Sequence, residues 1–507
     1  MPKSIKNLFK AGSPAGIVTV ALICLLFVQA AWAQQPGEKS FSDNPTLPQG
    51  IQGQRIRSAI DTVNSGDPER VRRFINSECT EAFRAGFPMD DHIGVFMGLF
   101  GQTGGLDFFG IRSYVPERKG ETVVILKDRN FEGWWGITFR FAAGPESLIG
   151  GININSARPP SGINEPPLTE AQMVKETRAL LDKLIAKGAF SGAFLLAKGD
   201  QVLLTEAGGE ASKAFHVLNN IDTKFNLGSM NKMFTSTAVI RLVEQGKLAL
   251  DDPISRYINE SWLPKSVTDK ITIRHLLTHS SGLGSYFNET YDRSSRELFR
   301  KLDDYKPLIK DERPAFEPGS RFQYSNTGMF LLGVVIEKVT GQDYFDDIRQ
   351  VIYKPAGMTN SDSYEMDVPV ENLAIGYSPD PKSPAGWRNN LYKHVIKGGP
   401  AGGGFSTVKD LHKFALALLA GKYVSPAGLK IMWTDHLKAN YGFGFGVNQG
   451  SAGKVVGHGG GFSGINSNLD IYLDSGYIVV VMSNIDSGAG PVANRVGQWL
   501  ARVGSAK

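Results

Sequence analysis

Cysteine is nearly absent from this sequence of 507 residues, which contains only Cys24 and Cys79. Cys24 lies in an N-terminal segment that we expect to be removed, so the remaining protein has no pair of cysteines for an internal disulfide. This excludes a scaffold stapled by disulfides, and the fold must be held by a hydrophobic core. Cys79 is predicted to be a small buried apolar residue rather than a nucleophile.

An excess of charge of one sign is also lacking. The formal net charge is +5 at pH 7, but three lysines and no acidic residue lie in the first 33 residues. The rest of the chain has 52 basic and 50 acidic side chains, a net charge of +2. Binding to nucleic acid or to an anionic membrane surface therefore has no support from charge. The composition, 41% hydrophobic and 21% charged, is that of a globular protein, and the length predicts two or three domains.

The N-terminal apolar run is too short to span a bilayer comfortably, since it covers only residues 16–28. It follows a lysine-containing start and precedes Ala31 and Ala33, small residues at the two positions that a signal peptidase reads. We predict that residues 1–33 are a secretory signal cut before Gln34, with an uncleaved membrane anchor as the alternative. The expected location is periplasmic or secreted, without a stable membrane span after cleavage.

Residues 34–49 are polar and predicted to be a tether, and residues 50–158 to be a small α+β domain. Helical spacing at residues 56–63 and 71–75 precedes strand patterns at residues 122–126 and 135–141. Helices followed by antiparallel strands resemble the cone-shaped nuclear-transport-factor-2-like fold in pattern, without a motif that carries chemistry. A linker rich in proline and glycine is predicted at residues 159–167.

A second and larger domain is predicted from residue 168 to residue 505. It opens with an amphipathic helix at about residues 169–186 and two strands at residues 194–205. The middle of the domain is helical and rich in loops. Strands return only at residues 467–472 and 478–482, before a last helix at about residues 491–501. The sheet is therefore expected to be assembled from distant parts of the chain.

Ser229 and Lys232 form a Ser-x-x-Lys motif at the predicted start of a helix. The apolar residues that follow share one helical face, so Ser229 lies at a helix N-terminus, where the positive potential favours an oxyanion. Residues three apart lie on the same face, which brings the Lys232 amine to the Ser229 hydroxyl. A serine hydroxyl needs such a base, and a buried lysine has a pKa low enough to act as one. A simple helix-cap role for Ser229 is the alternative.

The Ser-x-x-Lys spacing occurs two more times. Ser406 is predicted to cap a helix, with Lys409 in solvent. Ser451 and Lys454 are predicted to lie in a turn that leads into a strand, with no helix to align them. The spacing alone is thus weak support for a site.

Two further groups of residues favour the Ser-x-x-Lys motif at Ser229 and Lys232 as the site. Tyr324 and Asn326 lie at a predicted junction between a loop and a helix, from which both side chains can enter one cleft. A tyrosine near a lysine is expected to have a lowered pKa and to act as a base. His458 and the three glycines after it, Gly459 to Gly461, lie near a strand edge, where a substrate backbone can approach closely.

The order of Ser-x-x-Lys, Tyr-x-Asn and His-Gly-Gly resembles the serine β-lactamase and penicillin-binding-protein superfamily. The class C β-lactamase-like branch, with its D-aminopeptidases and esterases, is the most similar. Residues 273–283 and 402–411 also resemble segments of this group. The resemblance covers about residues 165–505. It implies a β-lactamase/transpeptidase-like fold, with an antiparallel sheet flanked by helices and an all-helical subdomain, after the small α+β domain.

The resemblance also implies roles for individual residues. Ser229 would form an acyl-enzyme, while Lys232 and Tyr324 move the protons. Asn326 would orient the substrate amide or Lys232. His458 takes the place of a lysine that reads a substrate carboxylate, next to Gly459 and Gly460. The backbone N–H groups of Ser229 and Gly461 would form the oxyanion hole.

No cofactor and no metal are expected for this chemistry. His275 and His279 have a spacing that can hold zinc, but Leu276 stands where a zinc protease motif needs glutamate, so a zinc hydrolase is disfavoured. A Ser–His hydrolase that uses His279 is disfavoured as well, because no Gly-x-Ser-x-Gly elbow surrounds Ser229. His279 is predicted to be structural.

The histidine at position 458 shifts the expected substrate. Lysine is a permanent cation, whereas histidine is mostly neutral at pH 7, so the anchor for a substrate carboxylate is weakened. We therefore expect an exported serine hydrolase that cleaves ester or D-amino-acid amide bonds in a small molecule or short peptide, including a cell-wall peptide. The alternatives are a penicillin-binding sensor or weak enzyme on the same scaffold, and a true class C-like β-lactamase.

Overall fold

The computed structural model describes residues 40–163, 165–380 and 382–503. The predicted signal at residues 1–33 and the start of the predicted tether lie outside these residues. Two compact units divide the chain, Met1–Ile163 and Asn164–Lys507, and each is described by itself. In the described part of the chain, no helix has both the length and the apolar character needed to cross a membrane.

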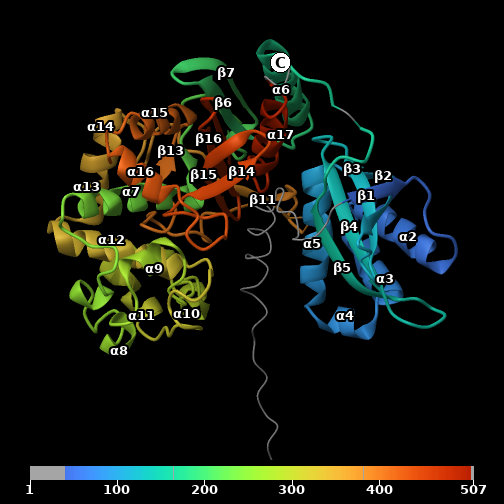
Figure 1. Cartoon of the computed structure of the whole chain (residues 1–507), viewed down its shortest axis with the longest axis horizontal. Helices are drawn as coiled ribbons and strands as arrows, with labels where there is room; N and C mark the ends of the chain where they lie inside the picture. The colour runs from blue at the N-terminus through green and yellow to red at the C-terminus, as the bar shows by residue number, and fades with distance from the viewer. Residues whose placement is uncertain (1–39, 164, 381, 504–507) are drawn as a thin grey trace, which may run out of the picture. The chain divides into compact units, whose positions relative to one another are not determined.

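The first unit is a five-stranded antiparallel sheet with helices on one face (Figure 1). Its helices are α2 (Ile51–Ser65), α3 (Pro68–Glu78), α4 (Glu81–Ala85) and α5 (Met89–Thr103). Its strands, in their order across the sheet, are β1 (Ser40–Asn44), β2 (Leu106–Val115), β3 (Thr122–Asp128), β4 (Trp134–Phe141) and β5 (Ile149–Ser156). The predicted helices and the strands of residues 122–141 are present. The likeness to a nuclear-transport-factor-2-like fold stays a prediction.

Part of the predicted tether belongs to this sheet. Residues 40–44 form β1, which pairs antiparallel with β2, so the tether prediction is wrong for them. The reason is one buried ion pair: Arg112 of β2 donates to both oxygens of Asp43 at 2.8 and 2.9 Å, and Ser161 N donates to the same carboxylate at 3.0 Å. A polar segment looks like a linker, but a buried charge must be paired, and here the partner lies about 70 residues away in sequence. Cys79 is buried as predicted.

The second unit is built on a six-stranded antiparallel sheet in the order β14-β15-β16-β17-β6-β7. The strands are β6 (Gly192–Lys198), β7 (Gln201–Gly208), β14 (Gly446–Gly450), β15 (Gly453–Phe462), β16 (Ile465–Tyr472) and β17 (Tyr477–Ser483). Figure 1 shows green β6 and β7 beside the orange to red C-terminal strands. The predicted assembly from distant segments is confirmed, because β17 pairs with β6.

Helices pack on both faces of this sheet. The helices α6 (Glu170–Ala186) and α17 (Gly490–Leu500) pack against each other and the sheet, and α15 (Val408–Leu419) packs on β17 and β6. Every residue of β17 is buried, as expected for a strand covered on both sides. Short strands lie in pairs outside the main sheet, among them β8 (Glu210–Ser212) with β9 (Val217–Leu218), and β11 (Tyr377–Pro379) with β12 (Trp387–Asn389).

A helical region fills the middle of the second unit. Its longer members are α7 (Asn231–Glu244) and α12 (Asn326–Thr340), which pack together, and α16 (Pro426–Met432). The short helices are α8 (Lys265–Thr268), α9 (Ile273–Leu277), α10 (Glu289–Arg293), α11 (Lys306–Ile309), α13 (Tyr344–Ile348) and α14 (Lys354–Ala356). Single turns are η2 (Ile254–Arg256), η3 (Arg296–Leu298), η4 (Leu302–Tyr305) and the π-type η5 (Arg349–Tyr353). The predicted antiparallel sheet with flanking helices and an all-helical part is thus present.

Candidate active site

Ser229 lies where a turn of 3₁₀-helix enters α7. The strand β10 (Phe225–Asn226), paired with β13 (Phe405–Ser406), leads into η1 (Gly228–Met230), and α7 begins at the next residue. The first N–H groups of a helix have no acceptor within the helix, so the Ser229 N–H is available to a ligand. The Ser229 side chain is nearly buried, with the residue 9% exposed. The predicted position at a helix N-terminus is confirmed.

Lys232 is fully buried and its amine reaches three oxygens. The Nζ atom lies 3.0 Å from Ser229 Oγ and 3.0 Å from Asn326 Oδ1, and it donates to the carbonyl of Ala401. Burial lowers the pKa of Lys232 well below its usual value. A neutral amine has two N–H groups and one lone pair. Because the Asn326 and Ala401 oxygens only accept hydrogen bonds, both N–H groups are used there, and the lone pair faces the Ser229 hydroxyl.

The carbonyl of Ala401 is supplied by a glycine-rich loop, residues 398–404, that lies under η1. Gly403 N donates to the Gly228 carbonyl at 3.0 Å, and Asn231 Nδ2 donates to the Gly399 carbonyl at 2.9 Å. A side chain at position 398 would place its Cβ 1.8 Å from the backbone nitrogen of Gly404, so only glycine fits there. The loop can therefore hold its carbonyl groups in this shape only with glycine at position 398.

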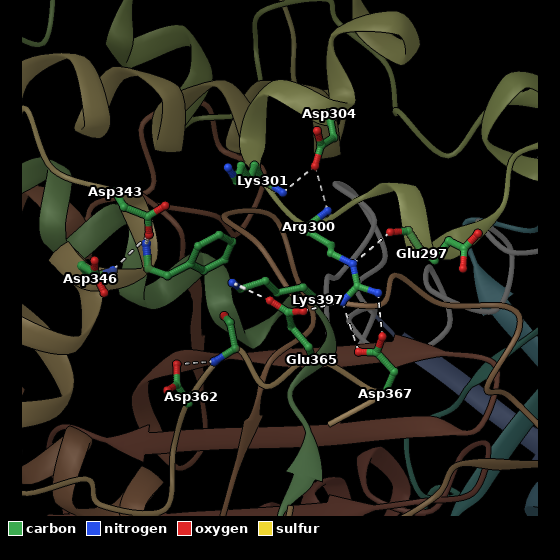
Figure 2. A network of polar contacts seen from close by, with 12 residues as sticks. Glu297, Arg300, Lys301, Asp304, Asp343, Asp346, Asp362, Glu365, Asp367 and Lys397 are labelled. Atoms are coloured by element: carbon green, nitrogen blue, oxygen red, sulfur yellow. Dashed lines mark hydrogen bonds and ion pairs between the residues drawn. The ribbon is translucent and has the colours of Figure 1, made fainter. Parts of the chain in front are cut away.

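A network of charged side chains anchors the start of this loop to the helical region (Figure 2). Lys397 donates to Glu365 at 3.1 Å, and Arg300 is bonded to Glu365 and, at 3.1 and 2.6 Å, to Asp367. These residues are partly exposed, and each exposed ion pair contributes at most about 1 kcal/mol. Their effect on the site is indirect, through the placement of the loop that follows Lys397.

Tyr324 and Asn326 lie at the junction of a loop with α12, as predicted. Ser325 caps the helix by accepting from Gly328 N at 2.8 Å, and its hydroxyl donates to the Gly284 carbonyl at 2.9 Å. The Asn326 amide has both ends used, because Oδ1 accepts from Lys232 and Nδ2 donates to Ser285 Oγ at 3.2 Å. Asn326 thus fixes the lysine.

The Tyr324 ring lies beside the lysine, with Lys232 Nζ 4.7 Å from the ring centroid. Burial raises the pKa of Tyr324, and the nearby Ser229 side chain only partly opposes this rise. The prediction of a lowered pKa is therefore wrong. The reason is that a lysine held neutral by burial supplies no positive charge to stabilise a tyrosinate. Tyr324 is present as a neutral phenol near Ser229, and its buried hydroxyl has no hydrogen-bond partner among the described residues.

The three glycines after His458 lie within β15 and bring that strand close to Ser229. A side chain at position 460 would place its Cβ 2.0 Å from the carbonyl oxygen of Leu227, so only glycine allows the approach. The backbone nitrogen of Gly461 lies 2.9 Å from where a Cβ on Gly228 would be. The strand β14 pairs with β15 only as far as Gly457. Among the described residues, residues 458–462 of β15 therefore have no strand partner on that side.

His458 does not face an open cleft. It is 5% exposed, its Nε2 lies 3.0 Å from the Tyr441 hydroxyl, and its Nδ1 lies 2.6 Å from the Gly459 carbonyl. Burial, with a contribution from Lys232, lowers the pKa of His458 to about 3. His458 takes the place of a lysine that reads a substrate carboxylate, but both of its ring nitrogens have protein partners and its ring is neutral. That His458 contacts substrate stays a prediction. The weakening of the carboxylate anchor is thus greater than expected.

The other two copies of the Ser-x-x-Lys spacing lie outside the site. Ser406 is in β13, where its hydroxyl bonds to Ser361 Oγ at 2.8 Å, and the residue that caps α15 is Thr407. The prediction of Ser406 as the cap is wrong by one residue. Lys409 pairs with Asp222 at the surface, as a solvated lysine was expected to do. The third copy is a turn that leads into β15, as predicted.

The two histidines with zinc-like spacing have other partners. His275 closes a capping box at the start of α9, with its Nδ1 3.2 Å from Thr272 N. His279 is fully buried, and its ring contacts Ser325 N and Tyr441. Within the residues that the structure describes, no cluster of three histidine, cysteine or acidic side chains has the arrangement of a metal site.

Comparison with known proteins places this geometry in a family. The model of the β-lactamase family matches residues 177–501, which is more than half of the chain, so the chain belongs to the β-lactamase family. The expected resemblance to the serine β-lactamase and penicillin-binding-protein superfamily is confirmed, and the chain is a serine hydrolase-family protein on a β-lactamase/transpeptidase-like fold.

Individual relatives in this family differ in their described activities. The chain is 30% identical over 327 residues to penicillin-binding protein 4* of Bacillus subtilis, covering 61% of this chain and 71% of that protein. It is 30% identical over 238 residues to the esterase EstB of Burkholderia gladioli, covering 44% and 59%. A D-stereospecific amidohydrolase from Streptomyces sp. matches in structure with a TM-score of 0.53 and 26% identity, covering 64% of this chain and 96% of that chain. Family membership therefore leaves the substrate open.

Three residues that contact the site were missed from the sequence. Ala401 acts through its carbonyl, which any residue has, so its type carries no signal. Ser285 is a common loop residue. Tyr441 follows no recognisable motif, and only its place between two histidines identifies it.

Proposed function

We propose that the protein is an exported hydrolase that cleaves ester or D-amino-acid amide bonds through an acyl-enzyme on Ser229. The observation that supports this most is the environment of Lys232. Asn326 Oδ1 and the Ala401 carbonyl can only accept hydrogen bonds, so they use both N–H groups of the neutral amine. The lone pair of Lys232 Nζ remains, and it faces Ser229 Oγ at 3.0 Å. A buried neutral amine in hydrogen-bond contact with a serine is the arrangement that a general base requires.

In the proposed acylation, Ser229 Oγ attacks the substrate carbonyl carbon while its proton passes to Lys232 Nζ. The carbonyl oxygen becomes an oxyanion, and the N–H groups of Ser229 and Gly461 stabilise it. The intermediate collapses when the bond to the alcohol or amine breaks and that group takes the proton. Tyr324 is a neutral phenol near Ser229, so in this proposal it relays the proton instead of acting as a tyrosinate.

Deacylation reverses the same steps with water. Water attacks the acyl carbon, gives one proton to the base, and Ser229 leaves with a proton as the acid is released. Tyr324 is the group we propose for placing this water, because its buried hydroxyl lies near Ser229 and has no hydrogen-bond partner among the described residues. Asn326 acts by holding Lys232 in place, since its amide is used at both ends.

The character of the substrate follows from the charge of the site. Lys232, His279 and His458 are basic side chains at the site, and burial lowers the pKa of each and favours its neutral form. A substrate carboxylate near β15 would lack a cation there, and burying an unpaired charge is costly. We therefore propose an uncharged ester or amide, in a small molecule or short peptide, in preference to a β-lactam or a peptide with a terminal carboxylate.

Labelling with a fluorophosphonate and with a fluorescent penicillin tests the acyl-enzyme. We expect the fluorophosphonate to label the wild-type protein and the Ser406→Ala variant, and to leave Ser229→Ala unlabelled. A protein labelled by penicillin alone, without turnover of any ester or amide, would instead be a penicillin-binding sensor.

A substrate panel tests the preference for neutral substrates. Each ester and D-amino-acid amide is assayed as a matched pair, with and without a free carboxylate at the leaving-group end. We expect higher kcat/KM for the neutral member of each pair and slow turnover of cephalosporins. Cephalosporin turnover at the rate of a dedicated β-lactamase would establish the class C-like alternative.

Export rests on the first 33 residues and has its own test. We expect the mature protein to begin at Gln34 and to be recovered from the periplasm or the medium. N-terminal sequencing of the protein from each cell fraction measures this, and an intact N-terminus in the membrane fraction would show an anchor instead.

A further inference from the structure

Behind the proposed nucleophile and base lies a row of three buried aromatic side chains, His279, Tyr441 and His458. They are 0%, 3% and 5% exposed. His279 Nε2 lies 3.1 Å from Tyr441 Oη, and Tyr441 Oη lies 3.0 Å from His458 Nε2. We call these three residues the His–Tyr–His bridge. The proposed reaction uses none of their protons.

Backbone groups at the two ends determine where every hydrogen of the bridge lies. Ser325 N donates to His279 Nδ1 at 3.1 Å, so a neutral His279 carries its hydrogen on Nε2 and donates it to Tyr441. The Gly459 carbonyl can only accept, so His458 carries its hydrogen on Nδ1 and accepts from Tyr441 at Nε2. The Tyr441 hydroxyl can therefore accept a hydrogen bond from His279 and donate one to His458 at the same time. A second proton on either histidine would disrupt this series of hydrogen bonds.

The bridge also holds the loop that carries Tyr324. Gln323 N donates to the His279 carbonyl at 2.7 Å, and Ser325 N donates to its ring, so His279 binds both neighbours of Tyr324. The rings of His279 and Tyr324 are 4.3 Å apart. His279 has a φ of 53°, an uncommon value for a residue other than glycine, and the contacts on both sides of its ring keep it there.

We propose that the His–Tyr–His bridge is a positioning device for the reaction. His279 and Tyr441 set the place of the Tyr324 hydroxyl against Ser229 and tie it to the strand edge at Gly459. This inference rests on the proposed function, because it assigns positioning residues to the same reaction. It predicts that the bridge controls the rate of the chemical steps and leaves the binding of substrate unchanged.

The first test removes the central hydroxyl. In Tyr441→Phe the ring stays, but His279 Nε2 loses its acceptor and His458 Nε2 loses its donor. We expect kcat to fall about 10- to 100-fold, the cost of a small misplacement at a reacting centre, with KM changed less than about twofold. The matched control is Tyr423→Phe, which removes another buried hydroxyl, bonded to the Ile352 carbonyl at 3.0 Å, away from the site. Its kcat is expected to equal that of the wild type.

A second pair of variants separates the two bonds of His279. Asparagine places an acceptor where Nδ1 was and tolerates positive φ, so His279→Asn keeps the bond to Ser325 and loses Tyr441. Glutamine reaches toward Tyr441 and loses Ser325. We expect His279→Asn to match Tyr441→Phe in kcat and His279→Gln to be slower, with KM close to that of the wild type in both. This pair decides the proposal even if Tyr441→Phe does not fold.

The outcomes distinguish this inference from the proposed function. A wild-type protein that is not labelled at Ser229 would refute the proposed function, and with it the bridge as a device for that reaction. A labelled wild type with folded variants of unchanged kcat would overturn the bridge alone. A rise in KM at constant kcat would also overturn it, because that result means substrate contact. Melting temperatures of all variants establish that the compared proteins are folded.

Discussion

The same four-residue spacing occurs at Ser229 and at Ser406, and the two places differ in almost everything else. Lys232 is fully buried and its amine contacts Ser229, whereas the Lys409 side chain is 45% exposed and pairs with Asp222. Ser229 lies on the turn that opens a helix, while Ser406 lies in a strand. A Ser-x-x-Lys motif therefore becomes a candidate site only where the fold removes water from the lysine.

The energetic difference between the two lysines follows from solvation. A solvated ammonium keeps its proton at neutral pH and cannot accept another. Burial disfavours the charged form, and it lowers the pKa of Lys232 well below the usual value. The same burial keeps Tyr324 protonated and His458 neutral, so the whole site is a neutral polar cluster.

The largest expected effect separates the two serines. Ser229→Ala removes the nucleophile and is expected to lower kcat by about 10⁵-fold. Ser406→Ala removes a buried hydrogen bond to Ser361, so it should reduce stability by about 1 kcal/mol without changing kcat. Steady-state kinetics and thermal unfolding of both variants measure this. Equal activity of the two variants would show that the two motifs do not differ in catalytic function.

The two lysines are compared by replacing each with methionine, which keeps the length of the side chain. Lys232→Met loses the proposed base, and we expect kcat to fall about 10³-fold. Lys409→Met loses only a surface ion pair and should change stability by less than about 1 kcal/mol. A Lys232→Met enzyme that keeps its rate would show that another group is the base.

Tyr324→Phe tests the second member of the neutral cluster. Without the hydroxyl, the proton relay next to Ser229 is lost, and kcat is expected to fall about 10²-fold with little change in KM. Pre-steady-state measurement shows whether acylation or deacylation is slowed. Retention of both rates would leave Lys232 as the sole carrier of protons.

The pH dependence of kcat/KM should report Lys232. The base must be neutral, so activity is expected to rise with pH through the lowered pKa of Lys232 and then to level off. Asn326→Asp puts a carboxylate beside the amine, which favours its charged form and should move this rise to higher pH by about one unit or more. Asp222→Asn, at the partner of Lys409, should leave the profile in place. A profile that Asn326→Asp does not move would assign the rise to another group.

Sequence patterns predicted much of this fold because local rules govern it. The helix at residues 170–186 has a Thr169 capping box, and β6 and β7 are joined by a two-residue turn. The segment of residues 40–44 was missed because its pairing depends on Arg112, far away in sequence. Ser406 was misplaced by one residue, an ordinary uncertainty at a helix boundary.

By itself, the sequence determined the candidate nucleophile and its partners, since Ser229, Lys232, Tyr324 and Asn326 were identified from their order and local context. The tertiary structure decided their chemical state. The buried lysine, the protonated Tyr324 and the neutral His458 all follow from desolvation, which depends on how distant segments pack. The spacing of residues along a chain says which groups can meet, but only the packed fold says how much water remains around them.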